Sequence, residues 1–374
     1  MATYKTMEDI DTSGRALNLA EPGTQIIEIK QTSESKYFHI NWNITNKCNF
    51  SCTYCHPYNY EGSSPTFKLD TYKKFVNKIK KQISKDRKLI ISFAGGEPTA
   101  MPEFDELLTW LVEQDVAVGN TTNGSKSIKF WEKHKKSFSW VAFSFHSEKT
   151  NINHCVKVVE TLWAHTNLSV RVMMHPKEEY FNKCIDFFEI LKTEPPESYF
   201  HVEKVPIIAD WLTDKERPHD YTPEQQAQLE GQLWIRRQPT VDISKQPQFN
   251  DAISADMIYQ LKDKVYLDRL NTNQIYANEK NKFKGWSCNA GIDGLYVSEL
   301  GFISGASCLP EGPDEWGTGI KWLGHIDKID DFNLPTSPYI CPKSACYCNT
   351  DIILGKKNLE FDLTDETIHS SVGW

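Results

Sequence analysis

The chain has 374 residues, of which 39% are hydrophobic and 25% charged, and its formal net charge is -8. This length suits one α/β core with a smaller appended module, and the composition excludes wholesale disorder. The negative charge and the lack of a basic stripe argue against nucleic acid as the main partner. The sequence contains no run of 18 apolar residues, so it predicts no membrane span. The N-terminus lacks the apolar region of a signal peptide. We therefore expect a cytoplasmic protein whose thiols are reduced.

Residues 1–36 are polar and predict an N-terminal extension. From residue 37 onward, apolar runs alternate with amphipathic stretches. The expected strands begin at Tyr37, Lys88, Val116, Ser139, Leu168 and Tyr199. The expected helices cover residues 69–84, 101–114, 127–137, 151–165 and 178–191.

This βαβ alternation implies a parallel sheet with right-handed crossovers. Six units are too few for a closed eight-stranded barrel. The predicted fold class is therefore α/β, with a partial (β/α)6 TIM-type barrel over residues 37–213. In such folds the chemistry gathers at the carboxyl ends of the strands.

The rest of the chain has a different character. Residues 214–285 are polar and rich in Gln and Asn, which predicts a connector or insertion with a helix in TPEQQAQLEGQLWIRRQ. Residues 286–350 hold five of the ten cysteines and a predicted β-hairpin that turns at Leu300 and Gly301. They predict a small cysteine-rich module, followed by a C-terminal tail over 351–374.

Cys48, Cys52 and Cys55 stand directly after the first predicted strand, with three and then two residues between them. Thiolates are the preferred ligands of iron-sulfur centres, and three ligands for a four-iron cubane leave one iron open. A structural zinc site is the alternative, but it needs a fourth ligand, and His56 follows Cys55 too closely to close the same tetrahedron easily. Core cysteines are a weaker alternative in so polar a loop.

Gly95, Gly96, Glu97 and Pro98 end the second predicted strand. Paired glycines permit close backbone approach and positive φ, and the glutamate can accept a hydrogen bond from a cationic group. A purely structural strand-to-helix turn would use the same residues.

Together these two motifs resemble those of the radical S-adenosylmethionine (SAM) superfamily, over roughly residues 37–210. Cys48, Cys52 and Cys55 match its CxxxCxxC motif, with the aromatic Tyr54 before the third cysteine, and residues 95–98 match its GGEP motif. The resemblance implies a 4Fe-4S cluster whose three cysteines are catalytic, with residues 95–98 holding the methionine ammonium of SAM. It also implies a 5′-deoxyadenosyl radical that removes hydrogen from a substrate C-H bond, and an electron donor such as flavodoxin or ferredoxin.

The same resemblance assigns further SAM contacts to later strands. Asn123 ends the third strand, Ser144 lies in the fourth and Arg171 in the fifth. Ser144 and Arg171 are expected to contact the ribose and carboxylate of SAM, because arginine binds carboxylates through paired hydrogen bonds. An ion pair within the barrel is the alternative for Arg171.

The late cysteines, a cysteine on either side of a hairpin and then a group of three, resemble the auxiliary-cluster modules called twitch and SPASM domains. Five cysteines imply the shorter type, with one auxiliary 4Fe-4S cluster. Four ligands are needed, so the pattern leaves open which four are used, and a four-cysteine zinc site is an alternative. The candidate ligands are Cys288, Cys308, Cys341, Cys346 and Cys348.

The remaining candidates are less specific. We expect Cys155 and Cys184 to be buried core thiols. Lone histidines such as His56, His175 and His201 usually pack or form hydrogen bonds. Asp293, Glu299 and Glu203 are candidates for a base that removes a proton from an oxidised substrate, although a solvated or ion-paired carboxylate is the simpler interpretation of each.

Three functions compete. The first is an oxidase or epimerase of a small polar metabolite, such as a sugar or aminocyclitol, with the auxiliary cluster as electron acceptor. The second is a maturase of a ribosomally made peptide or protein, and the third is a non-catalytic metal-binding scaffold. The sequence does not choose among them.

Overall fold

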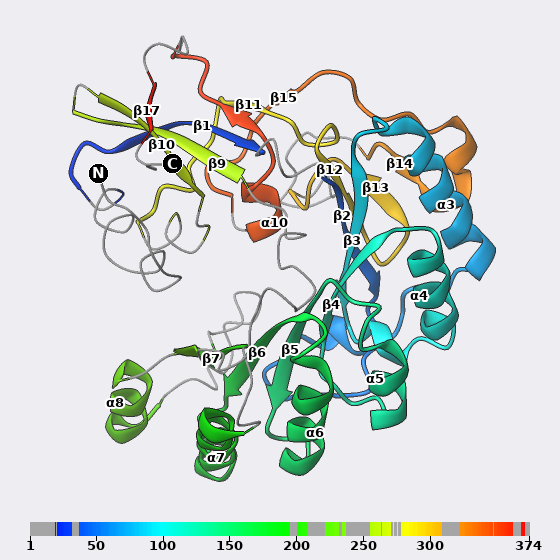
Figure 1. Ribbon diagram of the computed structural model, residues 1–374, viewed down its shortest axis with the longest axis vertical. Helices are drawn as coiled ribbons and strands as arrows, with labels where there is room; N and C mark the ends of the chain where they lie inside the picture. The colour runs from blue at the N-terminus through cyan, green and yellow to red at the C-terminus, as the bar shows by residue number, and fades with distance from the viewer. Residues whose placement is uncertain are drawn as a thin grey trace.

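The computed structural model describes most of the chain (Figure 1). The described residues are 19, 21–31, 37–194, 200–207, 221–231, 234–236, 255–262, 264–270, 272, 275, 278–308, 322–346, 348–361 and 368–370. Among them, no helix combines the length and apolar character needed to cross a membrane.

The larger of two sheets has the strand order β14-β13-β12-β2-β3-β4-β5-β6-β7-β8. From β12 to β7 the neighbouring strands are parallel. The predicted strands correspond to β2 (Tyr37–Thr45), β3 (Lys88–Gly95), β4 (Ala117–Thr122), β5 (Trp140–His146), β6 (Asn167–Met174) and β7 (His201–Pro206). In the described part of the chain the outermost strands do not pair with each other, so the sheet is open and the fold is mixed α/β.

The predicted helices follow one another around the outer side of this sheet (Figure 1). They are α3 (Leu69–Gln82), α4 (Phe104–Glu113), α5 (Ile128–His134), α6 (Ile152–Leu162) and α7 (Glu178–Thr193). Their apolar faces bury one side of every central strand. Trp42 of β2, for example, packs edge-on against Tyr72 and Phe75 of α3 at 5.6 and 4.9 Å between ring centroids. Cys155 and Cys184 lie in this core at 0% exposure, as predicted.

The opposite side of the sheet, here called the inner face, is polar. Since side chains alternate along a strand, the residues between the helix-facing ones point inward. On β2 the helix-facing residues are apolar, whereas the inner face carries His39, Asn41 and Asn43. The neighbouring strands add Ser92 and Ser144. The inner face therefore offers polar side chains to a ligand, whereas the helix-facing side of the sheet is filled by apolar side chains.

The smaller sheet has the order β15-β11-β16-β1-β9-β10-β17. Its strands come from both ends of the chain and from residues 255–357. They are β1 (Gln25–Gln31), β9 (Ala255–Leu261), β10 (Lys264–Arg269), β11 (Ser287–Cys288), β15 (Tyr339–Ile340), β16 (Lys356–Lys357) and β17 (Ile368–Ser370).

This sheet differs from the segment boundaries expected from the sequence. The N-terminal extension supplies β1, which pairs with both β9 and β16. The expected connector supplies β9 and β10, and the expected tail supplies β16 and β17. The three segments join the cysteine-rich residues because their apolar side chains, among them Ile26, Met257 and Leu354, form one core with Cys288.

The predicted hairpin exists but belongs to the larger sheet. It consists of β12 (Gly294–Val297) and β13 (Phe302–Ser304), with Gly301 at φ +86° in the turn. β12 pairs in parallel with β2, and its Leu295 and Val297 join the main core. The short β14 (Gly324–His325) completes that margin. The helix expected after residue 221 is α8 (Pro223–Gly231), followed by β8 (Trp234–Arg236).

His39 makes the stability of this fold depend on pH. It is 4% exposed on the inner face of β2, with its Nε2 2.7 Å from Ser92 Oγ. Burial lowers the pKa of His39 to about 3. Below about pH 6.5 the unfolded chain therefore takes up a proton that the folded chain does not, and stability falls with decreasing pH.

Lowering the pH from 7 to 5 should destabilise His39→Gln by about 2 kcal/mol less than it destabilises the parent. Urea unfolding at both pH values measures this difference. Ser92→Ala retains the histidine and should keep the pH dependence of the parent. An equal loss in the parent and in His39→Gln would contradict the assignment.

Candidate active site

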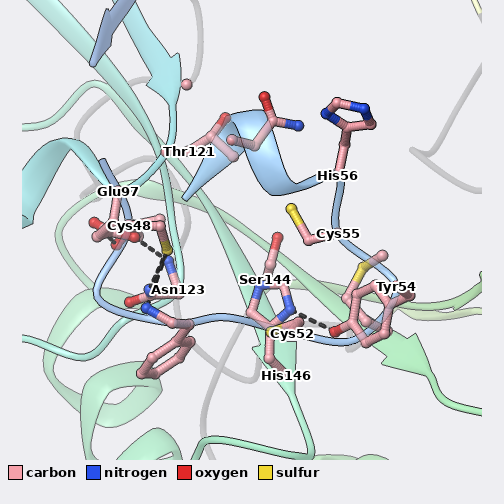
Figure 2. Close-up of a pocket in the computed structure, with 16 residues that line it drawn as sticks. Cys48, Cys52, Tyr54, Cys55, His56, Glu97, Thr121, Asn123, Ser144 and His146 are labelled. Carbon is pink, nitrogen blue, oxygen red and sulfur yellow. Dashed lines mark hydrogen bonds between the residues drawn. The ribbon is translucent and has the colours of Figure 1, made fainter. Parts of the chain in front are cut away.

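Cys48, Cys52 and Cys55 follow β2 in a loop at the carboxyl ends of the parallel strands. They line a single cavity of about 500 Å³, a volume in the range of small-molecule sites (Figure 2). Residues from the ends of β3, β4, β5 and β6 complete its wall. The structure thus brings the three predicted cluster ligands together with Gly95, Gly96, Glu97, Asn123, Ser144 and Tyr54.

Gly95 and Gly96 allow the end of β3 to touch the start of the cysteine loop. A Cβ on Gly95 would lie 2.2 Å from the carbonyl oxygen of Thr45, and one on Gly96 would lie 2.3 Å from that of Lys47. Gly95 also has φ +116°, a conformation that favours glycine. The contact is closed by hydrogen bonds from Gly96 N to Thr45 O at 2.7 Å and from Glu97 N to Lys47 O at 2.9 Å. The glycines therefore place the loop that begins at Cys48.

Glu97 binds the protein's own strand ends in this structure. It is 1% exposed, and its carboxylate accepts hydrogen bonds from the backbone N and hydroxyl of Thr99, the hydroxyl of Thr122 and the backbone N of Asn123. Burial raises the pKa of Glu97, and these hydrogen bonds oppose the shift. Its side chain thus joins the ends of β3 and β4, and because it also lines the cavity, its expected role as an acceptor for a ligand cation stays a prediction.

Asn123 connects this network to the first cysteine. Its Nδ2 donates to Asn49 Oδ1 at 3.0 Å and lies 3.7 Å from Cys48 Sγ (Figure 2). The backbone N of Phe50 lies 3.3 Å from the same sulfur. Burial raises the pKa of Cys48, while both donors favour its thiolate, the form that binds iron.

The side chain of Tyr54 reaches β5 and also forms a hydrogen bond with Cys52. Its hydroxyl lies 2.6 Å from His146 Nδ1, and the two rings stack with their centroids 6.0 Å apart (Figure 2). Burial lowers the pKa of His146 to about 4, so the imidazole is neutral at pH 7. A neutral ring can accept from the tyrosine, which anchors the loop between Cys52 and Cys55.

Glu148 holds the same part of the loop, and no sequence motif pointed to it. Its side chain is 4% exposed, forms a 2.8 Å ion pair with His175, and accepts from the backbone N of Thr53 at 3.0 Å and from the Thr53 hydroxyl. His175 Nδ1 accepts in turn from Lys177 N at 3.0 Å. The position of Glu148, two residues beyond the end of β5, was the only available hint.

Arg171 and Pro98 do not line the cavity. Arg171 pairs in register with Ser144 on the inner face but is exposed, and β6 contributes Met173 to the cavity wall instead. Of the two expected SAM contacts, Ser144 lies in the cavity wall and Arg171 does not. Pro98 starts the short 3-10 helix Pro98–Ala100 and is buried.

The other predicted histidines and carboxylates have local partners. His56 lines the cavity and its Nδ1 accepts from Tyr58 N at 3.2 Å. Glu299 accepts from the Tyr58 hydroxyl. Asp293 forms a 3.5 Å ion pair with Arg87, which supports a structural role. His201 and Glu203 lie on β7, outside the cavity wall.

Four of the five late cysteines lie together, and we call them the second thiol group: Cys288, Cys308, Cys341 and Cys346. The first three line one small cavity. Burial raises the pKa of Cys308 to about 12, and the nearby Asp351, Cys288 and Cys341 add to that shift. Burial also raises the pKa of Cys346, with Cys308 and Cys288 contributing.

Cys348 lies apart from the second thiol group. Its sulfur is 2.8 Å from the Thr350 hydroxyl and 3.8 Å from Nδ2 of Asn41 on the inner face of β2. Cys346 is held in place by Asn281, which exchanges hydrogen bonds of 2.8 and 3.0 Å with its backbone. The structure therefore separates two cysteines that the sequence could not distinguish.

The chemistry of both thiol groups fits iron-sulfur clusters. Among the described residues, no three His, Cys, Asp or Glu side chains converge as ligands of a single metal ion must. A cubane spreads its ligands over several irons and needs no such convergence. Beside the second thiol group, the Ser304 hydroxyl is buried without a hydrogen-bond partner in the described structure, and it is a donor suited to a cluster sulfide. That cavity measures about 20 Å³, so its thiols must move apart to admit a cubane.

The comparison with family models gives a match to this part of the chain. The radical SAM superfamily model matches residues 42–175, which include the cysteine loop, the Gly95–Gly96 turn and the ends of β4, β5 and β6. This stretch of the chain is thus similar to the radical SAM superfamily. Members of this family are enzymes that use a 4Fe-4S cluster and SAM.

Curated relatives match a similar length of the chain. GTP 3′,8-cyclase of Haemophilus influenzae (strain PittEE) is 31% identical over 124 residues, which are 29% of this chain and 36% of the relative. GTP 3′,8-cyclase of Yersinia pestis is 26% identical over 109 residues, 28% of this chain and 32% of the relative. The chain therefore spans about a third of the length of these relatives.

Solved structures give weaker matches. SuiB of Streptococcus suis bound to S-adenosylmethionine shares 12% identity at a TM-score of 0.44, over 79% of this chain and 64% of SuiB. BtrN in complex with AdoMet and 2-DOIA shares 16% identity at a TM-score of 0.27, over 36% of this chain and 56% of BtrN. Overlaps at these scores do not define a substrate for this chain.

We expect Glu148→Gln to weaken the hold on the cysteine loop, since the amide loses the ion pair with His175 and one acceptor for Thr53. Residues that orient metal ligands typically change metal affinity by tenfold or more. The reconstituted variant should lose iron to a ferrous chelator about tenfold faster than the parent. Glu160→Gln, on the exposed face of α6, is the matched control, and equal rates in both variants would count against the role of Glu148.

Proposed function

We propose that this chain is a radical SAM enzyme that acts on a small polar metabolite and carries a second iron-sulfur cluster. The observation that carries the proposal is the single cavity shared by Cys48, Cys52, Cys55 and the Gly95–Gly96 turn. When bound there, a 4Fe-4S cluster and SAM supply a 5′-deoxyadenosyl radical that removes hydrogen from a substrate C-H bond. An external donor such as flavodoxin or ferredoxin provides the electron.

The chain's own residues bind and orient SAM. The backbone at Gly95 and Gly96 lines the cavity together with the cysteines and has no side chain to block a ligand, and Ser144 of β5 adds a hydroxyl to the wall. Asn123 and Tyr54 hold the loop and also line the cavity. Such fixed placement matters because a primary alkyl radical attacks any nearby C-H bond.

The open sheet works as a partial (β/α)6 barrel in this proposal, with the substrate on its inner face. That face carries hydroxyl and amide groups, and β6 and β7 add Arg171 and Glu203 in register with each other. Because buried polar groups need partners, a face of this kind favours a ligand with several hydroxyl or amino groups. This supports a sugar or aminocyclitol as the substrate class, and oxidation or epimerisation as the reaction type.

The second thiol group holds an auxiliary 4Fe-4S cluster of the twitch type in this proposal. Four gathered thiols supply a complete ligand set, in contrast to the three of the first site. The partnerless Ser304 hydroxyl supports a cluster there over a bare thiol cavity. When bound, this cluster would accept the electron that an oxidised substrate releases.

SAM cleavage tests the enzyme and its substrate class. The anaerobically reduced, reconstituted chain should convert SAM to 5′-deoxyadenosine, and the Cys48→Ala, Cys52→Ala, Cys55→Ala triple variant should not. Deuterium should pass into 5′-deoxyadenosine from deuterated amino sugars or aminocyclitols. Transfer from deuterated peptides alone would favour a peptide maturase, and no cleavage by a fully loaded chain would favour a non-catalytic scaffold.

Single substitutions test the ligand set of the auxiliary cluster. We expect the triple variant to retain about four irons. Adding Cys346→Ala should lower that iron content markedly, because one iron of the proposed cubane would lose its protein ligand. Adding Cys348→Ala should leave about four irons, since that thiol lies beside Asn41 and Thr350. Zinc in place of iron, or iron loss with Cys348→Ala alone, would refute this assignment.

A further inference from the structure

Lys356 is a buried cation beside the second thiol group. It lies in β16, directly opposite Cys288 of β11 in the antiparallel register, and it is 4% exposed. Its ammonium lies 5.5 Å from the centre of the Phe283 ring, in the same core as Cys341 and Cys346. Lysine is almost never fully buried without a partner, so this position needs an explanation.

Backbone carbonyl groups hold the ammonium in place. Lys356 Nζ donates to the carbonyl oxygens of Asp351, Ile352 at 3.3 Å and Leu354 at 3.1 Å, at and just beyond the end of α10 (Asn349–Ile352). In the described part of the chain these acceptors are all neutral, so no direct carboxylate contact cancels the charge. The positive charge is thus fixed next to the thiols.

A buried carboxylate stands near the same thiols. Asp351 is 5% exposed. Its carboxylate accepts hydrogen bonds from the backbone N of Ser307 at 3.0 Å and from the Ser307 hydroxyl at 2.5 Å, and Ser307 is the residue before Cys308. Burial raises the pKa of Cys346; Lys356 acts against this shift and Asp351 acts with it. Both charges therefore act on the sulfurs through a medium of low polarity.

We propose that Lys356 sets the reduction potential of the auxiliary cluster, by stabilising the extra negative charge of the reduced state. The inference rests on the proposed second cluster. One electron enters the cluster and no bond forms or breaks, so the reduced cluster is more negative by one unit. Net charge, hydrogen bonding and exposure are the levers by which a protein sets this potential. Lys356 thus acts through its fixed positive charge on the cluster, and this role requires no contact with the substrate.

A redox titration tests the role of Lys356. The triple variant without Cys48, Cys52 and Cys55 isolates the auxiliary cluster, and the electron paramagnetic resonance signal reports its reduced fraction. Lys356→Met should lower the ratio of reduced to oxidised cluster at a fixed potential about tenfold, which is about 59 mV for a one-electron couple. Asp351→Asn should shift the midpoint the opposite way.

Charge-matched variants separate this role from packing. Lys356→Arg keeps the charge and should keep the midpoint, and Lys357→Met removes the neighbouring, partly exposed charge of β16 and should shift it little. Lys356→Gln, whose amide can still donate to the carbonyl groups, replaces Lys356→Met if that variant does not load. An unchanged midpoint in a loaded Met or Gln variant, or an equal shift with Arg, would overturn the inference. Absence of iron in the triple variant itself would instead overturn the second cluster.

Discussion

The candidate site depends on one close approach between backbones, at the end of β3. Neither Gly95 nor Gly96 has room for a Cβ, because the carbonyl oxygens of Thr45 and Lys47 occupy that space. Any side chain there would push the end of β2 away from β3 and move the loop that starts at Cys48. The first cysteine is therefore placed by main-chain contacts, which tolerate far less adjustment than a contact between flexible side chains.

Further contacts extend this constraint over the whole loop. On one side, Glu97 joins β3 to Thr122 and Asn123 of β4, and Asn123 reaches the start of the loop. On the other side, the stretch between Cys52 and Cys55 is tied to β5 by Tyr54 and by Thr53. The cysteines lie between two anchors, so the loop is ordered before a cofactor binds. Binding then costs less conformational entropy, which is the general advantage of a preorganised site.

The strands and helices of the larger sheet could be predicted because each is recognisable from a short run of consecutive residues. Each strand from β2 to β7 is six to nine residues long and contributes apolar side chains to the core, and the helices between them have apolar faces. The smaller sheet was not predicted, since β11, β15 and β16 have two residues each and pair across long stretches of chain. Arg171 was assigned to SAM by the resemblance alone, and the structure places it outside the cavity wall. Glu148 belongs to no motif, and its role arises only where β5 and the cysteine loop meet.

Cys346 and Cys348 show why spacing alone cannot assign ligands. Residues two apart in an extended chain point to the same side, so a Cys-x-Cys pair looks equivalent in the sequence. Here α10 begins directly after Cys348, and the change of backbone direction turns that thiol toward Thr350 and Asn41. The backbone of Cys346 is fixed instead by Asn281, which leaves its thiol in the core with Cys288 and Cys341. The same helix ends at the carbonyl groups that hold Lys356. One short helix thus removes a fifth thiol from the second group and places a cation beside the remaining four.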